Sequence, residues 1–161
     1  MIAIVGLAVS CLEGYDPTEW YRRCHMGQDL WANATDVYEI HEEDHWANGE
    51  RLAYLSRTIA QVWLREPSER LPKARVIPGV PIGYRECTAA YMLAHVIPQT
   101  DVIGIYGITG DDEYEWERAN LEFWIGYGMG QGVEFKIHPN SKLMTSRFIC
   151  GHYGKQDWKA A

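Results

Sequence analysis

Residues 101–137 read DVIGIYGITGDDEYEWERANLEFWIGYGMGQGVEFKI, and this stretch decides the fold class. The apolar run at 101–107 is typical of a strand buried on both faces of a sheet. A polar turn at 109–112 precedes a long helix that we expect over 113–129, and the glycines at 130 and 132 end that helix. A further strand is expected over 133–137. A strand, a helix and a strand in succession favour parallel pairing of the two strands.

The same alternation continues toward the N-terminus. Residues 2–8, IAIVGLA, form a second apolar run that predicts a buried strand. The other expected elements are a helix over 16–27 starting with Asp16 and Pro17, short strands at 29–32 and 75–77, a strand at 36–41, and helices over 49–65 and 84–97. We therefore predict an α/β fold, a Rossmann-like three-layer sandwich with a mainly parallel sheet. We expect a single domain over 1–161, with a loosely packed tail from about 139 to 161.

Composition and charge limit the partners. The chain has 161 residues, of which 47% are hydrophobic and 23% are charged, as in ordinary globular proteins rather than disordered ones. Its 15 Lys and Arg against 22 Asp and Glu give a formal net charge of -7, which argues against a nucleic-acid polymer as partner. Ten Tyr and seven Trp against three Phe indicate aromatic side chains with a polar group. A small nucleotide remains a candidate ligand, because backbone N–H groups can hold its phosphates.

Cysteine usage and the N-terminal segment bear on location. The four cysteines at 11, 24, 87 and 150 form no C-x-x-C pair, so reduced cysteines in the cytoplasm are expected. The apolar start has no basic residues before it, so it predicts neither a signal peptide nor a lipoprotein anchor at Cys11. No apolar run approaches the roughly 20 residues that cross a bilayer, and we expect no membrane partner.

The loop after the first predicted strand is a candidate phosphate site. In open α/β sheets, ligands bind at the carboxyl ends of strands, so Gly6 and Ser10 are candidate contacts. The loop contains neither the G-x-G-x-x-G fingerprint nor a Walker A sequence. The alternative is that Gly6 serves only the packing of the strand against its neighbours.

Residues 41–45, HEEDH, match the H-E-x-x-H pattern of zinc proteases. Zinc binding by this motif requires a helix, whereas residues 37–40 are expected in a strand. A loop at the carboxyl end of a strand is therefore the preferred interpretation, and no metal or cofactor is predicted. His41 is then either a site residue or a solvated loop residue.

Acidic residues gather after the strand at 101–107. Asp111, Asp112 and Glu113 lie where negative charge stabilises a helix start, and that role alone accounts for them. Glu113 and Glu117 are one helical turn apart, and their mutual repulsion could raise one pKa toward neutrality, as a general acid or base requires. A solvated charged face is the alternative. The glycines at 126, 128, 130 and 132 are attributed to close packing against the sheet, and the basic residues between 65 and 85 to a solvated loop or a phosphate-facing edge.

Four stretches together resemble a family of small Rossmann-like proteins encoded by tailed bacteriophages. These are IAIVGLAVS, DVYEIH, TAAYMLAHVI and the stretch 101–137 quoted above, and the similarity extends through residue 137. The layout is more distantly similar to sialyltransferase-like glycosyltransferases. The resemblance implies a nucleotide or nucleotide-sugar ligand and a transferase, without fixing the chemistry.

The resemblance, with the residue types above, assigns two sets of site residues. The nucleotide-binding candidates are Gly6, Ser10, Asn33, Gly107, Thr109, Arg118 and Asn120. The candidate catalytic residues are Asp112, Glu113, Glu117 and His41.

Three functions remain open from the sequence. The first is a glycosyltransferase-like or N-glycosidic transferase that acts on a nucleotide or nucleotide-sugar. The second is a non-catalytic binder that sequesters a host signalling nucleotide, and the third is a virion or assembly component. A homo-oligomer is compatible with all three.

Overall fold

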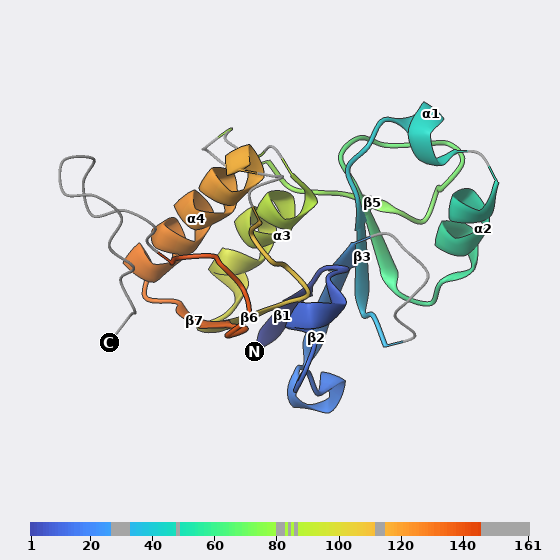
Figure 1. Ribbon diagram of the computed structural model, residues 1–161. Coiled ribbons are helices and arrows are strands. Elements are labelled where there is room, and N and C mark those ends of the chain that lie inside the picture. Colours follow the sequence, from blue (N-terminus) through green and yellow to red (C-terminus); the bar gives the residue numbers. More distant parts are fainter. Residues whose placement is uncertain are drawn as a thin grey trace.

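Within the residues that the computed structural model describes (1–26, 33–47, 49–79, 83, 85, 87–111 and 115–145), seven strands form one parallel sheet in the order β5-β4-β3-β2-β1-β6-β7 (Figure 1). The strands are β1 Ile2–Val5, β2 Arg22–Met26, β3 Asp36–Glu39, β4 Gln61–Leu64, β5 Arg75–Val76, β6 Val102–Tyr106 and β7 Glu134–Ile137. The helices are α1 Glu43–Trp46, α2 Glu50–Arg57, α3 Thr88–Val96 and α4 Glu115–Gly130, with short 3-10 turns η1 Val9–Cys11, η2 Pro17–Glu19 and η3 Ile97–Gln99. The predicted α/β fold with a parallel sheet is confirmed.

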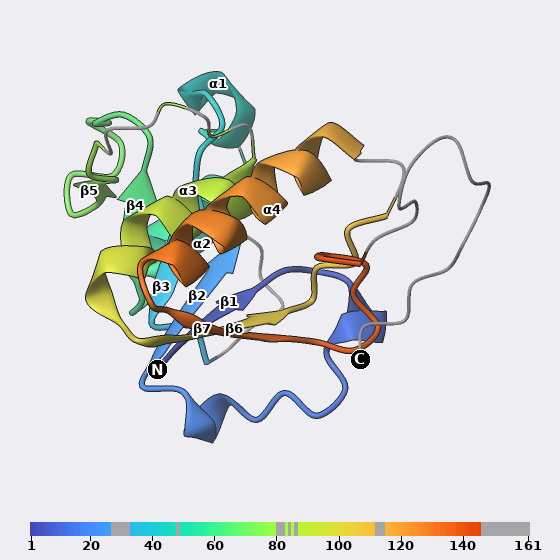
Figure 2. The ribbon, with the colours of Figure 1, turned by 90° about the vertical axis from the view of Figure 1, so that its left-hand side faces the viewer.

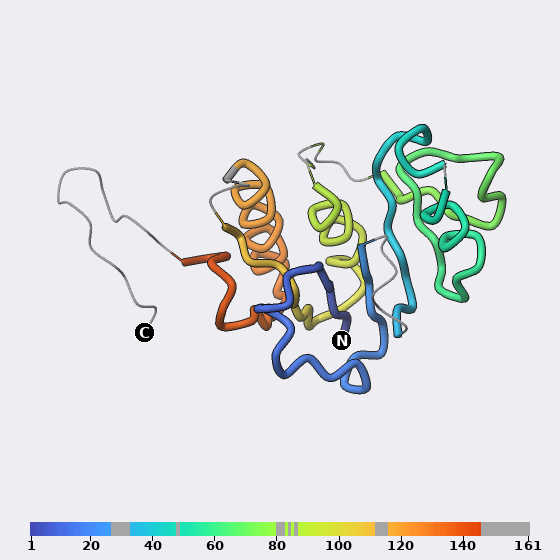
Figure 3. Tube along the Cα trace, turned by 45° about the vertical axis from the view of Figure 1, so that its right-hand side comes forward, coloured from blue at the N-terminus to red at the C-terminus, as the bar shows by residue number. Residues whose placement is uncertain are grey.

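The direction of winding changes between β1 and β6. From β1 the chain moves outward through β2, β3 and β4 to β5, then returns through α3 to β6 on the other side of β1. Since crossovers between parallel strands are right-handed, connections that run in opposite directions lie on opposite faces of the sheet. Accordingly α3 and α4 cover one face, while α1, α2 and the loop containing η1 and η2 lie on the other (Figures 1 and 3).

Strand β1 shows how the sequence fills both faces. Ile2 and Ile4 pack into the large cluster beneath α3 and α4, whereas Ala3 and Val5 face the opposite layer with Trp20. Within the described residues, no α-helix covers Ala3 and Val5. The indole of Trp20 lies directly on the backbone of β6 instead. A Cβ at Gly104 would overlap that indole, which explains why the central strand β6 contains a glycine.

The prediction of a helix over 16–27 is wrong beyond the first turn. Asp16 does cap a turn at Pro17, since its Oδ1 accepts the N–H of Thr18 at 2.8 Å. The turn ends at Glu19, and Arg22–Met26 forms β2 between β1 and β3. Residues 22–26 form a strand because their backbone makes hydrogen bonds to a neighbouring strand on each side. The helix-start residues at 16 and 17 carry no information about those hydrogen bonds.

The helix predicted over 49–65 is likewise divided. It ends at Arg57 in α2, and Gln61–Leu64 forms β4. Leu55 and Val62 are both buried in the cluster between α2 and the sheet, but they reach it from a helix and a strand. Ile59 lies fully exposed in the turn between them.

The other expectations fare as follows. The strand expected at 36–41, the short strand at 75–77 and the elements from 84 to 137 are found with small shifts at their ends. The strand expected at 29–32 lies outside the described residues. Of the expected loose tail, residues up to 145 are described, and Leu143 there is buried in the core beside Gly110.

The glycine series in α4 has more than one explanation. A Cβ at Gly128 would overlap the ring of Phe135 on β7, so close packing explains this position. At Gly126 and Gly130, by contrast, a Cβ would meet open space. Packing within the chain therefore explains only part of the series.

Membrane insertion receives no support from the fold. Among the described residues, none of the helices has both the length and the apolar character needed to span a bilayer.

Candidate functional site

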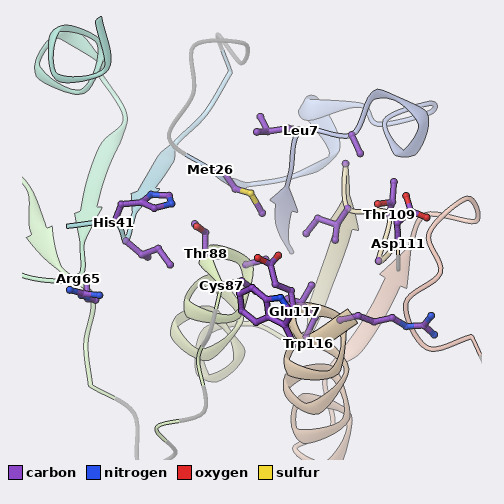
Figure 4. Close-up of a pocket in the computed structure, with 18 of the residues that line it drawn as sticks. Leu7, Met26, His41, Arg65, Cys87, Thr88, Thr109, Asp111, Trp116 and Glu117 are labelled. Carbon is purple, nitrogen blue, oxygen red and sulfur yellow. The ribbon is translucent and has the colours of Figure 1, made fainter. Parts of the chain in front are cut away.

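A cavity of about 830 Å³ opens at the carboxyl edge of the sheet, on the side covered by α3 and α4 (Figure 4). Its walls come from the residues that follow β1, β2, β3, β4 and β6 and from the first turns of α3 and α4. This is the edge at which open α/β sheets bind ligands, because the loops on the two faces diverge there. The volume lies within the range of about 300–1,000 Å³ typical of small-molecule sites.

His41 enters the cavity from the end of β3 and is held in place by Glu39. Glu39 Oε1 lies 2.5 Å from His41 Nδ1 and also accepts the backbone N–H of His41 at 3.1 Å. A carboxylate at Nδ1 holds the proton on that nitrogen, so Nε2 keeps its lone pair. The imidazole is 46% exposed and points into the cavity (Figure 4), so its basic nitrogen is accessible.

The carboxylate that orients His41 is itself buried. The side chain of Glu39 is 0% exposed, and its second oxygen, Oε2, lies 2.5 Å from a guanidinium nitrogen of Arg51 on α2. A buried charge needs such a counter-charge, because taking an isolated carboxylate out of water costs several kcal/mol. Arg51, Glu39 and His41 thus form a chain of contacts that runs from α2 to the cavity.

His45 lies on α1, beside His41. The two imidazole rings stack with centroids 5.3 Å apart and planes at 14°. The indole N–H of Trp46 donates to the carbonyl oxygen of His41 at 3.1 Å, which fixes α1 against the strand end. His41 thus precedes α1, and the H-E-x-x-H residues do not share one helix as zinc proteases require. Among the described residues, no group of three His, Cys, Asp or Glu side chains is placed to hold a metal ion.

Glu117 enters the same cavity from α4, across from His41 (Figure 4). Partial burial raises the pKa of the Glu117 carboxyl above its usual range, because burial disfavours the charged form. The sequence analysis attributed such a shift to repulsion by Glu113, which lies outside the described residues; among the described groups, the cause is burial. A carboxyl with a raised pKa can hold a proton closer to neutral pH.

The loop after β6 forms the wall opposite β3. It contains Gly107 and Gly110, both in the left-handed region with φ of 65° and 66°. Residues beyond β7 secure it: the N–H of Lys142 donates to the carbonyl of Thr109 at 2.6 Å, and its ammonium lies 2.5 Å from Asp111 Oδ1. Thr109, Gly107 and Asp111 all line the cavity.

Gly6 and Gly107 meet at the change of winding direction, beside the cavity. A Cβ on either one would overlap the carbonyl oxygen of the other. The N–H groups of Gly6 and Ala8 donate to the carbonyls of Tyr106 and Gly107 at 2.8 and 2.9 Å. The two loops therefore bind each other, and these two N–H groups are not directed at a ligand.

Several predicted site residues lie elsewhere. Asn33 precedes β3 at the amino edge, where its carbonyl accepts the Nε–H of Arg23 at 2.5 Å. Ser10 is exposed in η1, outside the cavity lining, and Asn120 is fully buried. Arg118 lines the cavity, but its guanidinium donates to Glu122 at 2.9 Å and to the carbonyl of Thr145 at 2.5 Å. Asp112 and Glu113 lie outside the described residues.

Of the predicted set, the cavity thus brings together His41, Glu117, Gly107, Thr109 and Arg118. Sequence reasoning missed Glu39 and Arg51, whereas Arg65, which lines the cavity after β4, belongs to the basic stretch that was interpreted as a solvated loop or a phosphate-facing edge. Glu39 did carry a signal, because a glutamate between Tyr38 and Ile40 in an apolar strand needs a partner. Arg51 carried none, since only the fold brings it to the end of β3.

Comparison of the chain with protein-family models, with curated proteins and with solved structures finds no match to any of them.

Proposed function

We propose that this protein is an enzyme of glycosyl transfer that acts on a nucleotide or a nucleotide-sugar in the cavity at the carboxyl edge of the sheet. One observation carries the proposal. An imidazole held by a buried carboxylate and a glutamic acid with a raised pKa face the same cavity from opposite walls. An accessible base and an accessible acid are what transfer at a sugar carbon requires.

The proposed step uses both groups. Glu117, protonated, gives its proton to the leaving group as the bond from the anomeric carbon to that group breaks. His41 Nε2 takes the proton of an acceptor hydroxyl or water as its oxygen bonds to the anomeric carbon. One bond forms, one breaks, and one proton moves at each end, so no redox partner or metal enters the balance.

The start of α3 and one arginine support a phosphate-bearing ligand, although Glu42, Asp44 and Asp111 also line the cavity. The first turn of α3, Thr88 to Ala90, is uncharged, and Thr88 and Ala89 line the cavity. The N–H groups at the start of a helix attract anions, and Arg65 adds a cation to the same wall. These features support binding of phosphate without a Walker or Rossmann glycine loop.

The test combines ligand binding with turnover. The full chain is incubated with a panel of nucleoside monophosphates and nucleotide-sugars, thermal shifts are recorded, and mass spectrometry follows the release of free base or free nucleotide. We expect at least one member to raise Tm and to be cleaved or transferred. Glu117→Gln should slow that turnover by about 10²-fold or more while the thermal shift remains.

Glu134→Gln is the matched control, because Glu134 is exposed on β7 at the opposite edge of the sheet. It should retain wild-type turnover. If every ligand were recovered unchanged while the thermal shifts persisted, the protein would be a nucleotide binder and not an enzyme. The absence of any thermal shift across the panel would remove the nucleotide as ligand.

A further inference from the structure

The most exposed residues of α4 between 116 and 130 carry no charge. Between Trp116 and Gly130, the exposed residues are Trp116, Ala119, Phe123, Gly126, Tyr127, Met129 and Gly130. Three aromatic rings are among them, with Trp116 at 56%, Phe123 at 39% and Tyr127 at 38% exposure. In Figure 2, α4 is the outermost helix on this side, with no other element of the described chain in front of it. A surface helix of a protein with 23% charged residues is expected to carry charge there.

Two glycines lie on this side, Gly126 within the helix and Gly130 at its last residue, and only the second is accounted for by the end of the helix. Gly126 and Gly130 lie four residues apart in a helix, where glycine is among the poorest helix formers. A Cβ at either position would meet open space, so nothing in the described chain requires their small size. Small residues in a helix allow the close approach of a second helix.

Four of the exposed residues form large and small pairs placed symmetrically about Phe123, whereas Gly126 and Met129 have no exposed counterpart. Seven positions before it lies Trp116, and seven positions after it lies Gly130. Four positions before it lies Ala119, and four positions after it lies Tyr127. An antiparallel copy of the helix, crossing at Phe123, therefore sets Trp116 against Gly130 and Ala119 against Tyr127. Trp116 and Tyr127 then each face a small residue on the other helix, and Phe123 faces its own copy.

We propose that two copies of this chain form a two-fold dimer through antiparallel α4 helices that cross at Phe123. A two-fold interface must be complementary to itself, and the arrangement of rings and small residues about Phe123 has that property. A partner of different sequence would not require it. Trp116 also lines the cavity at the carboxyl edge, so the second copy lies beside that cavity.

The first test is the mass of the full chain in solution. Sedimentation should give twice 18.5 kDa, about 37 kDa. Phe123→Glu places two carboxylates at the axis and should give the 18.5 kDa monomer with unchanged circular dichroism. A wild-type chain that sediments as a monomer at micromolar concentration would overturn the proposal, including the case in which residues 146–161 of the same chain cover α4.

Disulfide trapping then tests the direction of the pairing. Both variants are made in a Cys150→Ser background, because Cys11, Cys24 and Cys87 are buried. Phe123→Cys brings two thiols together at the axis and should give a covalent dimer on mild oxidation. Gly130→Cys is the matched control on the same side of the helix. Its two copies would lie about 21 Å apart along the antiparallel helices and should stay unlinked.

The outcomes are distinct. Linkage through Cys at 123 alone supports the antiparallel dimer. Equal linkage through both positions would indicate a parallel pair and would refute the proposed register, and linkage through neither would place the interface elsewhere. None of these readouts depends on the nucleotide proposal.

Discussion

Strand β3 carries a buried carboxylate at each end, and the surroundings of the two carboxylates differ. Asp36 at the amino end pairs with Arg22, whose Nε and NH2 groups lie 2.8 and 2.7 Å from its two oxygens. Glu39 at the carboxyl end pairs with Arg51 and His41. Both clusters thus combine a carboxylate, an arginine and an aromatic ring system.

The amino-end cluster is closed on itself. Asp36 also accepts the indole N–H of Trp63 at 2.6 Å and the hydroxyl of Thr35 at 2.8 Å. Burial alone would raise the pKa of Asp36, but these hydrogen bonds, led by that from Arg22, outweigh burial and lower it. The network continues from Arg22 to Gln99 and from Tyr38 to His95.

At the carboxyl end, one group remains accessible. His41 uses Nδ1 toward Glu39 and turns the rest of its ring to a cavity of about 830 Å³. The comparison shows that a buried ion pair by itself does not identify a site. What distinguishes a candidate site is a ring or carboxyl that the pair orients and that still faces open volume.

The largest loss of unfolding free energy is expected when Asp36 is removed from the amino-end cluster. Asp36→Ala leaves the guanidinium of Arg22, 12% exposed, and the indole N–H of Trp63 without their acceptor. Loss of one partner of a buried ion pair costs about 3–5 kcal/mol of unfolding free energy. Urea denaturation measures it, with Glu134→Ala on the exposed surface of β7 as the control. A loss below about 1 kcal/mol would show that the amino-end cluster is not structural.

The next largest effect is a dependence of unfolding free energy on pH, which arises from buried histidines. Burial lowers the pKa of His95 to about 4, with a further lowering by Arg22, and burial lowers that of His25 to about 4. Between about 6.5, the unfolded value, and 4, the unfolded chain binds more protons than the folded one, so stability falls as pH falls through this window. Each histidine accounts for a change on the order of 3 kcal/mol.

The check on this prediction is the slope of unfolding free energy against pH between 6.5 and 4. His95→Gln, which keeps an acceptor for the Tyr38 hydroxyl, should reduce the slope toward that of one histidine. An unchanged slope would mean that His95 is protonated in the folded protein.

A smaller effect on stability, with a larger effect on function, is expected at Glu39. Glu39→Gln keeps the size of the side chain but removes the charge between Arg51 and His41. Because Arg51 is 28% exposed and can be partly hydrated, we expect a loss of about 1–3 kcal/mol. Turnover should fall about 10- to 100-fold, as for other groups that orient a functional histidine.

The readout that separates the two roles of Glu39 is the pH profile of turnover. A positioning role predicts that the variant changes the pH profile, because the imidazole of His41 loses the carboxylate that orients it. A merely structural role predicts a loss of active protein with an unchanged profile.

The smallest effect, of opposite sign, is expected at Glu117. Since burial raises its pKa, the folded protein binds a proton at Glu117 more readily than the unfolded chain does. Its contribution therefore favours folding at acidic pH and opposes folding as pH rises. Glu117→Gln should raise Tm at pH 7 by at most about 4 °C, and the gain should vanish near pH 4. A variant that is less stable than wild type at both pH values would show that Glu117 stabilises the fold through its charge.

The sequence by itself determined those strands and helices whose own residue pattern is sufficient to predict them. The apolar runs of β1 and β6 and the helices α3 and α4 were predictable because burial on both faces, or helical periodicity, is written within each segment. The positions of His41 and Glu117 at the cavity were likewise predictable, since each follows a strand or begins a helix at the carboxyl edge of the sheet. Only the tertiary structure decided that Arg22–Met26 and Gln61–Leu64 are strands, because their hydrogen-bond partners come from β1, β3 and β5. The tertiary structure also placed Arg51 behind Glu39 and Asn33 at the far edge, since contacts between distant segments leave no periodic signal in the sequence.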